Sequence, residues 1–504
     1  MLPYLNNGNE MSRQYTVAFR GLNWGQDWQE GELSHCENLY TAQFPCLSQR
    51  PPRRELGQYP EPGGLISKDG LLVVSGGTVF HNGAAVGQVT PGRKQLAAIG
   101  DYVVIFPDKV YYNTAEGTFG SMEAEAVVTG AVFTDAAITA EGVSFPFRPG
   151  DAVTITGCAA EENNRTVILR SVEAGVLGVY ESTFVAGTEI GAVTLRRAVP
   201  DLDFICESNY RLWGTHGSTI YGSRYGDPFN FQVFDGLSGD SYYIDVASEG
   251  PFTGCIPYSG HICFFKEHTL HKLYGSKPGN FQIVTAQVCG VEAGSEKSLC
   301  VLNETLYYKG TGGVYAYTGG VPELVSANFG GCRFRNACAA ADDERCYFSM
   351  EGEDGWHLLT YDVRRGLWLR EDGLRCAVMT RWGGQVYLLT EEGTLWQTSG
   401  GEDTERVPWS VTFCPFSETV LNRKGYSRFH LRLELREGAW LQVQLRRDNE
   451  EAWETIYTTH GGRARTVSIP VLPVRCDRLE LRLTGRGNCL LRTLVRELTV
   501  GSDV

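Results

Sequence analysis

The residues whose types and spacing could support chemistry are few. His268 and His271 lie three positions apart in the segment KEHTLHK. On a helix this spacing would place two metal ligands on one face, but the surrounding residues are typical of a strand, where positions i and i+3 face opposite sides. A metal ion also needs more than two protein ligands. We therefore interpret both histidines as surface or interstrand residues and predict no metal site.

Acidic residues cluster at two further places. The first is the run Asp342, Asp343 and Glu344, and the second extends from Glu351 to Gly355. Carboxylates of this kind could bind calcium, but neither run matches the ligand spacing of a calcium loop. Asp and Gly are also the residues that hairpin turns favour. We interpret both clusters as turns.

The sequence contains none of the short motifs of nucleotide-binding, zinc-protease or serine-hydrolase sites. A glycosidase would need two carboxylates, one on each side of the sugar bond. The sequence has 59 Asp and Glu residues, and it does not single out one such pair. The aromatic segment from Arg224 to Phe234 has too few basic residues for a single-strand nucleic-acid binder and is interpreted as core and interface packing. We predict that the protein is not an enzyme, with no catalytic, cofactor-binding or metal-binding residues and no cofactor.

Composition favours an all-β fold. The chain has 60 Gly among 504 residues together with 24 Tyr and 23 Phe, against a usual Gly share of about 7%. This profile is typical of short strands joined by tight turns and excludes an all-helical protein. The 15 cysteines are scattered without CxxC pairs, so we expect reduced, buried thiols. No apolar stretch is long enough to span a membrane, and the start MLPYLNNGNEMSRQ lacks the pattern of a secretory signal.

A strand–turn–strand pattern rich in aromatic residues repeats along the chain. Its copies start at Leu71, Leu96, Tyr210, Cys255, Leu299, Ala337 and Cys376. The last four starts are separated by 44, 38 and 39 residues, close to the period of about 40–45 residues of four-stranded propeller blades. The spacing predicts one closed β-propeller of six or seven blades between Leu71 and Gly400, built from residues 61–120 and 201–404.

Other parts of the chain depart from this period. The copies at Leu96 and Tyr210 are 114 residues apart, and the surplus, residues 121–200, reads as short strands between Gly, Pro and Asn turns. We expect an inserted small β-barrel or sandwich there. Residues 405–504 alternate charged and apolar positions, which predicts a C-terminal β-sandwich. Residues 1–60 are expected to be an N-terminal arm that leads into the propeller.

Charge is divided unevenly between these parts. Residues 405–504 carry 16 Lys and Arg against 12 Asp and Glu, a net charge of +4, so the first 404 residues carry −18 of the total −14. The overall charge argues against a general nucleic-acid binder. The arginines of the C-terminal part are expected largely on alternating strand positions: Arg428, Arg432, Arg436, Arg446, Arg447, Arg478, Arg482 and Arg486.

Two stretches resemble a known family. The segment FRGLNWGQDWQEGELSHCENLYTAQFPCLSQRPPR from Phe19 is similar to the N-terminal motif of phage packaged-DNA stabilisation proteins, also called tail hub or nozzle proteins of short-tailed phages. The matching positions are Gly21, Leu22, Asn23, Leu33, Asn38, Leu39, Leu47, Arg50 and Pro51, and Pro52 stands where the motif has Gly.

The second stretch comprises RLWGTHGSTIYGSRYGDPFNF from Arg211 and GHICFFKEHTLHKLYGSKPGNFQI from Gly260, which resemble the propeller phrases of the same family. Matching positions are Leu212, Trp213, Ile220, Tyr221, Ser223, Asp227, Pro228, Phe264, Leu273, Gly275, Pro278 and Phe281. GTGGVYAYTG near Gly310 is similar to a further phrase.

The resemblance implies a structural virion protein in a phage tail, assembled in the host cytoplasm. It implies a cyclic ring, expected to be a hexamer, that lies below the portal and head–tail adaptor, extends the DNA channel and retains the packaged genome. Its partners would be further copies, the adaptor or portal, and tail fibre or needle proteins, with DNA passing through unbound and no membrane contact. The alternatives are a carbohydrate-binding or glycan-hydrolysing propeller and a tail-fibre or baseplate adaptor.

Overall fold

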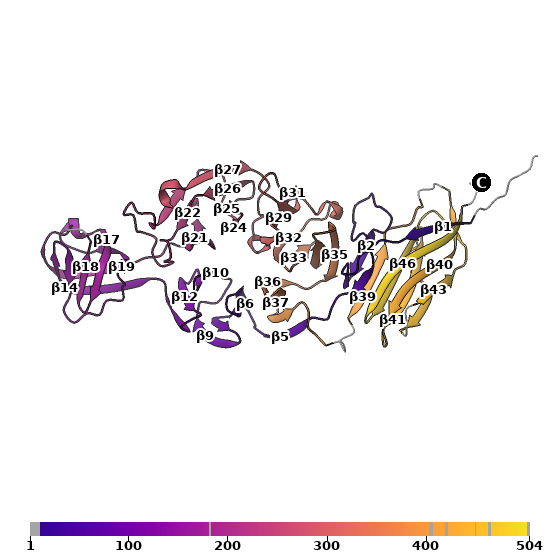
Figure 1. Ribbon diagram of the computed structural model, residues 1–504, viewed down its shortest axis with the longest axis horizontal. Helices are drawn as coiled ribbons and strands as arrows, with labels where there is room; N and C mark the ends of the chain where they lie inside the picture. Colours follow the sequence, from indigo (N-terminus) through magenta and orange to yellow (C-terminus); the bar gives the residue numbers. More distant parts are fainter. Residues whose placement is uncertain are drawn as a thin grey trace, which may run out of the picture. The chain divides into compact units, whose positions relative to one another are not determined.

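The computed structural model describes residues 11–180, 183–402, 407–418, 422–448, 450–461 and 465–500, and these form an all-β protein (Figure 1). The helical segments among them are single 3-10 turns: η1 (Glu161–Asn163), η2 (Pro278–Asn280), η3 (Glu296–Ser298) and η4 (Ala327–Phe329). The expected all-β class is confirmed. None of the helical segments in the described ranges could cross a membrane. Most of the N-terminal segment considered for a secretory signal lies outside the described residues.

The chain folds into two compact units. The first comprises Met1–Gln58, Gly312–Thr390 and Thr394–Val504, and the second comprises Tyr59–Thr311 and Glu391–Gly393. The N-terminal segment is therefore part of the same unit as the C-terminal residues.

The second unit contains four antiparallel sheets in which four consecutive strands follow one another. They are β6 (Pro62–Ser67), β7 (Leu71–Ser75), β8 (Thr78–His81) and β9 (Ala84–Gln88); β10 (Gln95–Ile99), β11 (Tyr102–Phe106), β12 (Val110–Asn113) and β13 (Thr118–Ser121); β20 (Phe204–Ser208), β21 (Arg211–His216), β22 (Thr219–Gly222) and β23 (Tyr242–Asp245); and β24 (Gly254–Tyr258), β25 (His261–Phe265), β26 (Thr269–Tyr274) and β27 (Gln282–Gln287). A hairpin of β28 (Cys300–Leu302) and β29 (Thr305–Gly310) follows.

These sheets coincide with the sequence repeats, although two of them begin earlier than the repeats suggested. β6 precedes Leu71 and β20 precedes Tyr210. The first strands lie next to one another in the order β6, β10, β20, β24. Apolar side chains of neighbouring sheets pack together, as Leu72 and Val74 do with Val103 and Ile105. Burying each such side chain contributes about 1.5–3 kcal/mol, so each sheet is stabilised by its neighbours.

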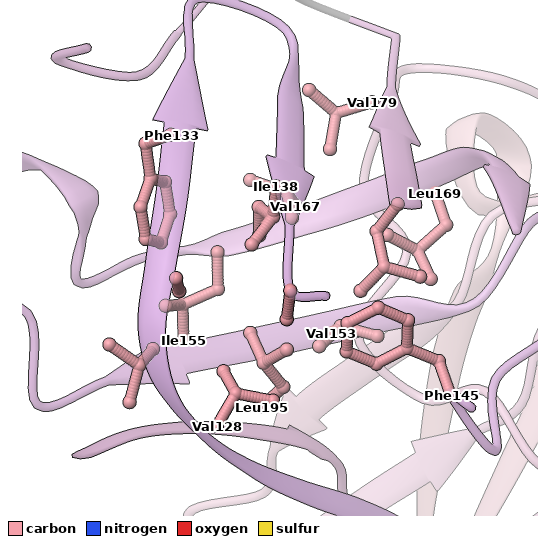
Figure 2. Packing of buried hydrophobic residues seen from close by; sticks show 14 of the residues in the cluster. Val128, Phe133, Ile138, Phe145, Val153, Ile155, Val167, Leu169, Val179 and Leu195 are labelled. Atoms are coloured by element: carbon pink, nitrogen blue, oxygen red, sulfur yellow. The ribbon is translucent and has the colours of Figure 1, made fainter. Parts of the chain in front are cut away.

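A closed six-stranded barrel interrupts the series between β13 and β20, as expected for residues 121–200. Its strands, in order around the barrel, are β14 (Ala124–Thr134), β15 (Ala137–Thr139), β18 (Val176–Val179), β17 (Thr166–Glu173), β16 (Ala152–Thr156) and β19 (Gly187–Arg197). Figure 2 shows alternate residues of these strands, among them Val128, Ile155 and Leu195, pointing into one apolar core. The barrel therefore has a core of its own.

The first unit contains further sheets of the repeating kind. They are the hairpin of β30 (Gly313–Tyr317) and β31 (Glu323–Leu324); the sheet of β32 (Arg335–Ala341), β33 (Arg345–Gly352), β34 (Gly355–Asp362) and β35 (Leu367–Asp372); and the sheet of β36 (Cys376–Trp382), β37 (Gln385–Thr390), β38 (Thr394–Gln397) and β5 (Arg54–Gln58). The last sheet takes its outermost strand, β5, from the N-terminal segment.

Two larger antiparallel sheets complete the first unit. One joins β3 (Leu39–Tyr40), β4 (Leu47–Gln49), β46 (Cys489–Val500), β40 (Lys424–Leu435) and β43 (Arg465–Pro470), with β1 (Met11–Thr16) and β44 (Arg475–Cys476) at its sides; we call it the β40 sheet. The other joins β2 (Leu33–Glu37), β39 (Pro408–Phe413), β45 (Leu479–Arg486), β41 (Trp440–Arg447) and β42 (Glu454–His460); we call it the β41 sheet. Strands from residues 11–49 belong to both sheets, so residues 405–504 do not form them alone.

Candidate functional site

The structure separates the two histidines of the KEHTLHK segment. His268 is exposed in the turn before β26, whereas His271 within β26 is buried. The His271 ring is bound at Nε2 by Ser248 Oγ, 2.9 Å away, and at Nδ1 by Thr285 Oγ1, 2.8 Å away. Burial, reinforced by the Lys266 ammonium, lowers the pKa of His271 to about 4. His271 is therefore a neutral core residue near pH 7 and does not pair with His268.

In each acidic cluster one carboxylate binds groups of its own turn. Asp342 Oδ1 accepts hydrogen bonds from the backbone N–H groups of Glu344 and Arg345, each at 2.7 Å. In the second cluster Asp354 pairs with His357 at 2.7 Å. These are the local bonds of hairpin turns. Among the described residues no three His, Cys, Asp or Glu side chains are grouped to hold a metal ion.

Two N-terminal motif residues, Asn38 and Arg50, take part in a polar cluster that we call the N-terminal joint. It comprises the buried residues Asn38, Tyr40, Arg50, Arg53 and Glu371 and the partly exposed Asp372. Arg50 Nε donates to Asn38 Oδ1 at 2.6 Å, and the Asn38 amide donates to the carbonyl of Pro408 at 2.9 Å. Both residues carry the resemblance, and both are buried. The bonds connect the N-terminal segment to the start of β39.

Arg53 forms the charged centre of this joint. Its guanidinium donates to Glu371, which also accepts the hydroxyl of Tyr40, and it pairs with Asp372 at 2.7 Å. Burial opposes ionisation of Asp372, but the guanidinium groups of Arg53 and Arg50 outweigh it and hold the pKa of Asp372 below its usual value. Buried charges are tolerated when they are paired in this way, so the joint fixes the N-terminal segment to the end of β35.

The Gly-Leu-Asn part of the motif packs against the same strand. The backbone N–H of Leu22 donates to the carbonyl of Trp368 at 2.7 Å. Gly21 has φ +81°, and a Cβ at this position would lie 2.6 Å from the Trp368 carbonyl oxygen. Only glycine fits this approach without strain, so the motif has a structural use here.

The DPFNF phrase joins the barrel to the neighbouring sheet. Asn230 donates to Asp151 Oδ1 at 3.0 Å and to Asp227 Oδ2 at 2.6 Å, and its own Oδ1 accepts the backbone N–H of Ala152 at 2.9 Å. Asp151 also pairs with Arg197 at 2.6 Å, with both side chains buried. We call this cluster the barrel joint. Within the Arg224–Phe234 segment the expected packing role applies to Phe229 and Phe231, which are buried, whereas Phe234 is exposed.

The C-terminal arginines divide between two sheets. Arg428 and Arg432 on β40 are exposed, while Arg446 and Arg482 lie on β41 and β45 of the other sheet. The remaining positions are Arg436 after β40, Arg478 before β45 and Arg486 at the end of β45, all exposed. Alternation therefore holds along individual strands, but the eight residues do not share one face.

Arg447 departs from the expected pattern. It follows Arg446 directly and so points to the opposite side of β41. The side chain is buried and pairs with Glu454 at 2.8 Å. Arg447 therefore links β41 to the start of β42. Because it is buried, it is not available to a partner.

No family model matches the chain, and no curated protein matches its sequence. Solved structures that show some similarity to the chain include BamB from Moraxella catarrhalis, which has 12% identity over 70% of this chain and 99% of its own, with a TM-score of 0.36. Hsv2 from Kluyvelomyces marxianus has 10% identity over 60% of this chain and 92% of its own (TM-score 0.25), and a family 29 carbohydrate-binding module has 14% identity over 25% and 80% (TM-score 0.13). These similarities are too weak to carry an argument about function.

The N-terminal motif could be recognised in the sequence, whereas the roles of Arg53, Glu371 and Asp151 could not. Arg53 lies three positions after Arg50, with two prolines between them. This spacing was the feature of the sequence that could have pointed to Arg53. No such feature points to Glu371 or Asp151, because an acidic residue in a strand or turn is expected at the surface unless its partner is known.

Proposed function

We propose that this protein is a structural component of a bacteriophage tail. It forms a ring below the portal and the head–tail adaptor, extends the DNA channel and retains the packaged genome. The N-terminal joint carries the proposal. Asn38 and Arg50, two residues of the motif that resembles packaged-DNA stabilisation proteins, bind each other through a buried hydrogen bond and hold the N-terminal segment in place. The motif residues thus have an architectural role, which suits a structural protein.

The proposal includes a closed propeller with seven blades. Six sheets of four antiparallel strands supply six blades, and the strands β28 to β31 supply the seventh. Strand β5 from the N-terminal segment completes the sheet of β36, β37 and β38, which is how a propeller closes its ring between early and late parts of a chain. The β40 and β41 sheets would form the C-terminal sandwich.

Charge gives the ring a physical means of passing DNA. The first 404 residues have a net charge of −18, and a phosphate polyanion gains little from contact with an acidic wall. A channel lined by this part of the chain would let the genome slide past without binding it. The basic C-terminal part, with a net charge of +4, would face an acidic surface of a neighbouring copy or of the adaptor.

A closed ring needs one heterologous interface repeated around an axis. We propose six copies in the ring, formed on the adaptor as template, with tail fibre or needle proteins as further partners. Location in the virion follows from this role, with assembly in the cytoplasm of the host.

Cosedimentation with purified portal–adaptor complex tests the proposal. The full chain should bind the complex at about 50 mM salt and less at about 500 mM, because salt screens surface charges. The double variant Arg428→Glu with Arg432→Glu should weaken binding, and Arg335→Glu, which alters an exposed arginine on β32, should not. A chain that fails to bind at either salt concentration would overturn the proposal.

A further inference from the structure

The β41 sheet has one apolar face and one polar face. On β41 the residues Leu441, Val443 and Leu445 are fully buried, while Gln442 and Gln444 between them are half-buried. The same alternation occurs on β45, where Arg482 and Thr484 lie on the half-buried side. The two strands pair in register, with Thr484 opposite Gln442 and Arg482 opposite Gln444. We call the half-buried side the glutamine face.

A tryptophan lies near each end of the glutamine face. Trp440 begins β41 on the same side as Gln442, and Trp453 in the loop after β41 stacks on Arg446 and Arg482, with 4.7 Å and 4.2 Å from each guanidinium carbon to the ring centroid. Trp453 is half-buried, as expected when one side of the indole is covered by the arginines. From residue 440 to 446 the strand extends about 20 Å at ~3.4 Å per residue, so the face is long enough for several sugar rings in a row.

Polar groups between the two tryptophans have unused hydrogen-bonding capacity. Within the described part of the chain, the Trp440 indole N–H, the Gln442 amide and the Thr484 hydroxyl bind no other side chain or backbone group. Gln444, in contrast, accepts Arg482 Nε and Nη2 at 2.9 Å and 2.7 Å and donates to Thr455 at 3.2 Å. On this face the Gln444 side chain is therefore held in place by hydrogen bonds. The polar groups of Trp440, Gln442 and Thr484 beside it are free to bind a ligand.

The charge of the face is positive. Arg446 is neutralised by Glu480 at 2.6 Å. Arg482 has no carboxylate partner among the described residues, and its guanidinium binds an amide oxygen and an indole instead. An arginine in this position can still pair with an incoming carboxylate.

We propose that the glutamine face binds an acidic oligosaccharide. Sugar rings have flat C–H faces that pack on indole rings, whose apolar area and N–H group suit amphipathic ligands. Their hydroxyl groups match the free amide, hydroxyl and indole N–H groups, since a few placed polar groups on an aromatic surface fix a ligand's orientation. A carboxylate on the sugar pairs with Arg482. This binding site is independent of the ring proposed above.

Titration of the full chain with acidic and neutral oligosaccharides tests the proposal. The probes are hexamers of galacturonate, alginate and hyaluronate, with the β-1,4-linked glucose hexamer as neutral comparison and a twelve-nucleotide oligo-dT as a different polyanion. Calorimetry should show binding of at least one acidic hexamer, at least tenfold weaker binding of the neutral one, and none of oligo-dT. Binding of no acidic hexamer, or tighter binding of oligo-dT, would overturn the inference.

Variants locate the site. Trp440→Ala and Trp453→Ala should each weaken binding at least tenfold, and Arg482→Gln should remove the preference for acidic over neutral sugar. Trp382→Ala is the matched control, because Trp382 is an exposed tryptophan at the end of β36. Gln442→Ala leaves both platforms in place and should still weaken binding at least threefold, which keeps the test valid if a tryptophan variant misfolds. Equal affinity of Gln442→Ala and Trp382→Ala would contradict the proposed location.

Discussion

Arg53 and Glu371 are 318 positions apart in the chain, yet the Arg53 guanidinium donates a hydrogen bond to the Glu371 carboxylate. Both side chains are buried. The contact ties the N-terminal segment to the end of β35, and the next residue, Asp372, takes the other arm of the same guanidinium. Arg53 thus connects the N-terminal segment with one of the repeating sheets.

Removing that arginine should destabilise the protein strongly. Arg53→Ala would leave the buried Glu371 carboxyl and the partly exposed Asp372 carboxylate with one guanidinium fewer, and loss of one partner of a buried ion pair costs about 3–5 kcal/mol. Urea unfolding should show this loss. Arg335→Ala, which removes an exposed arginine paired with Glu351 at 3.3 Å, should change the free energy of unfolding by less than about 1 kcal/mol. Equal effects of the two variants would contradict a buried joint.

His271 should make stability depend on pH. Burial lowers its pKa to about 4 in the folded chain, against about 6.5 in the unfolded chain. The neutral ring is favoured by folding, so its contribution is present above pH 6.5 and is lost as the pH falls towards 4.

Between pH 7 and pH 5 the loss at His271 should be on the order of 2 kcal/mol. His271→Gln keeps hydrogen-bonding groups near Ser248 and Thr285 but cannot become charged, so urea midpoints should fall less between these pH values. His268→Gln, at an exposed position, should behave like the unchanged protein. The prediction fails if both variants show the same pH dependence.

Asn230 should hold the barrel against the sheet formed by β20 to β23. Asn230→Ala removes two donated bonds and one accepted bond at a buried site, which costs about 1–3 kcal/mol for each partner left unsatisfied. Limited proteolysis should cut the variant faster between residues 198 and 203, where the barrel ends. Asn336→Ala, which changes an exposed asparagine on β32, is the control and should leave the cleavage rate unaltered.

Cysteine reactivity should follow burial. All 15 cysteines are free thiols, and Cys332 is exposed. Because Cys332 is exposed, alkylation of the native protein should reach it first. Partial desolvation and the nearby Asp354 and Glu353 raise the pKa of its thiol, so the reaction should speed up as the pH rises. Deeply buried thiols such as Cys36 should react only after unfolding. Mass spectrometry of a labelling time course checks the order, and early labelling of Cys36 would show that the described core is open.

Local patterns in the sequence predicted much of the fold. Period-two alternation located strands such as β41, and the interval between Leu96 and Tyr210 located the barrel. The pairing of β1 to β5 with distant strands was not predictable, because a short strand such as Leu39–Tyr40 has no pattern that names its partner. From the sequence, the C-terminal sheets were therefore expected to form from residues 405–504 alone.

The candidate sites depended even more on distant partners. Asp342 and His268 could be interpreted locally because turn chemistry decides their environment. Glu371, Asp151 and Gln442 could not, since their roles arise from residues brought near them by sheet register. Arg447 shows the limit of alternation, because two adjacent arginines must face opposite sides and one of them is buried.

Imaging the chain bound to purified portal–adaptor complex shows whether it forms the proposed ring. Electron cryomicroscopy should show six copies in a ring coaxial with the portal, each with a seven-bladed propeller and a channel wall of acidic residues. The contacts of the C-terminal sheets should be lost in the Arg428→Glu, Arg432→Glu variant. A chain that stays monomeric in the presence of the complex, or a ring whose channel is lined by Lys and Arg, would contradict the proposed role in the phage tail.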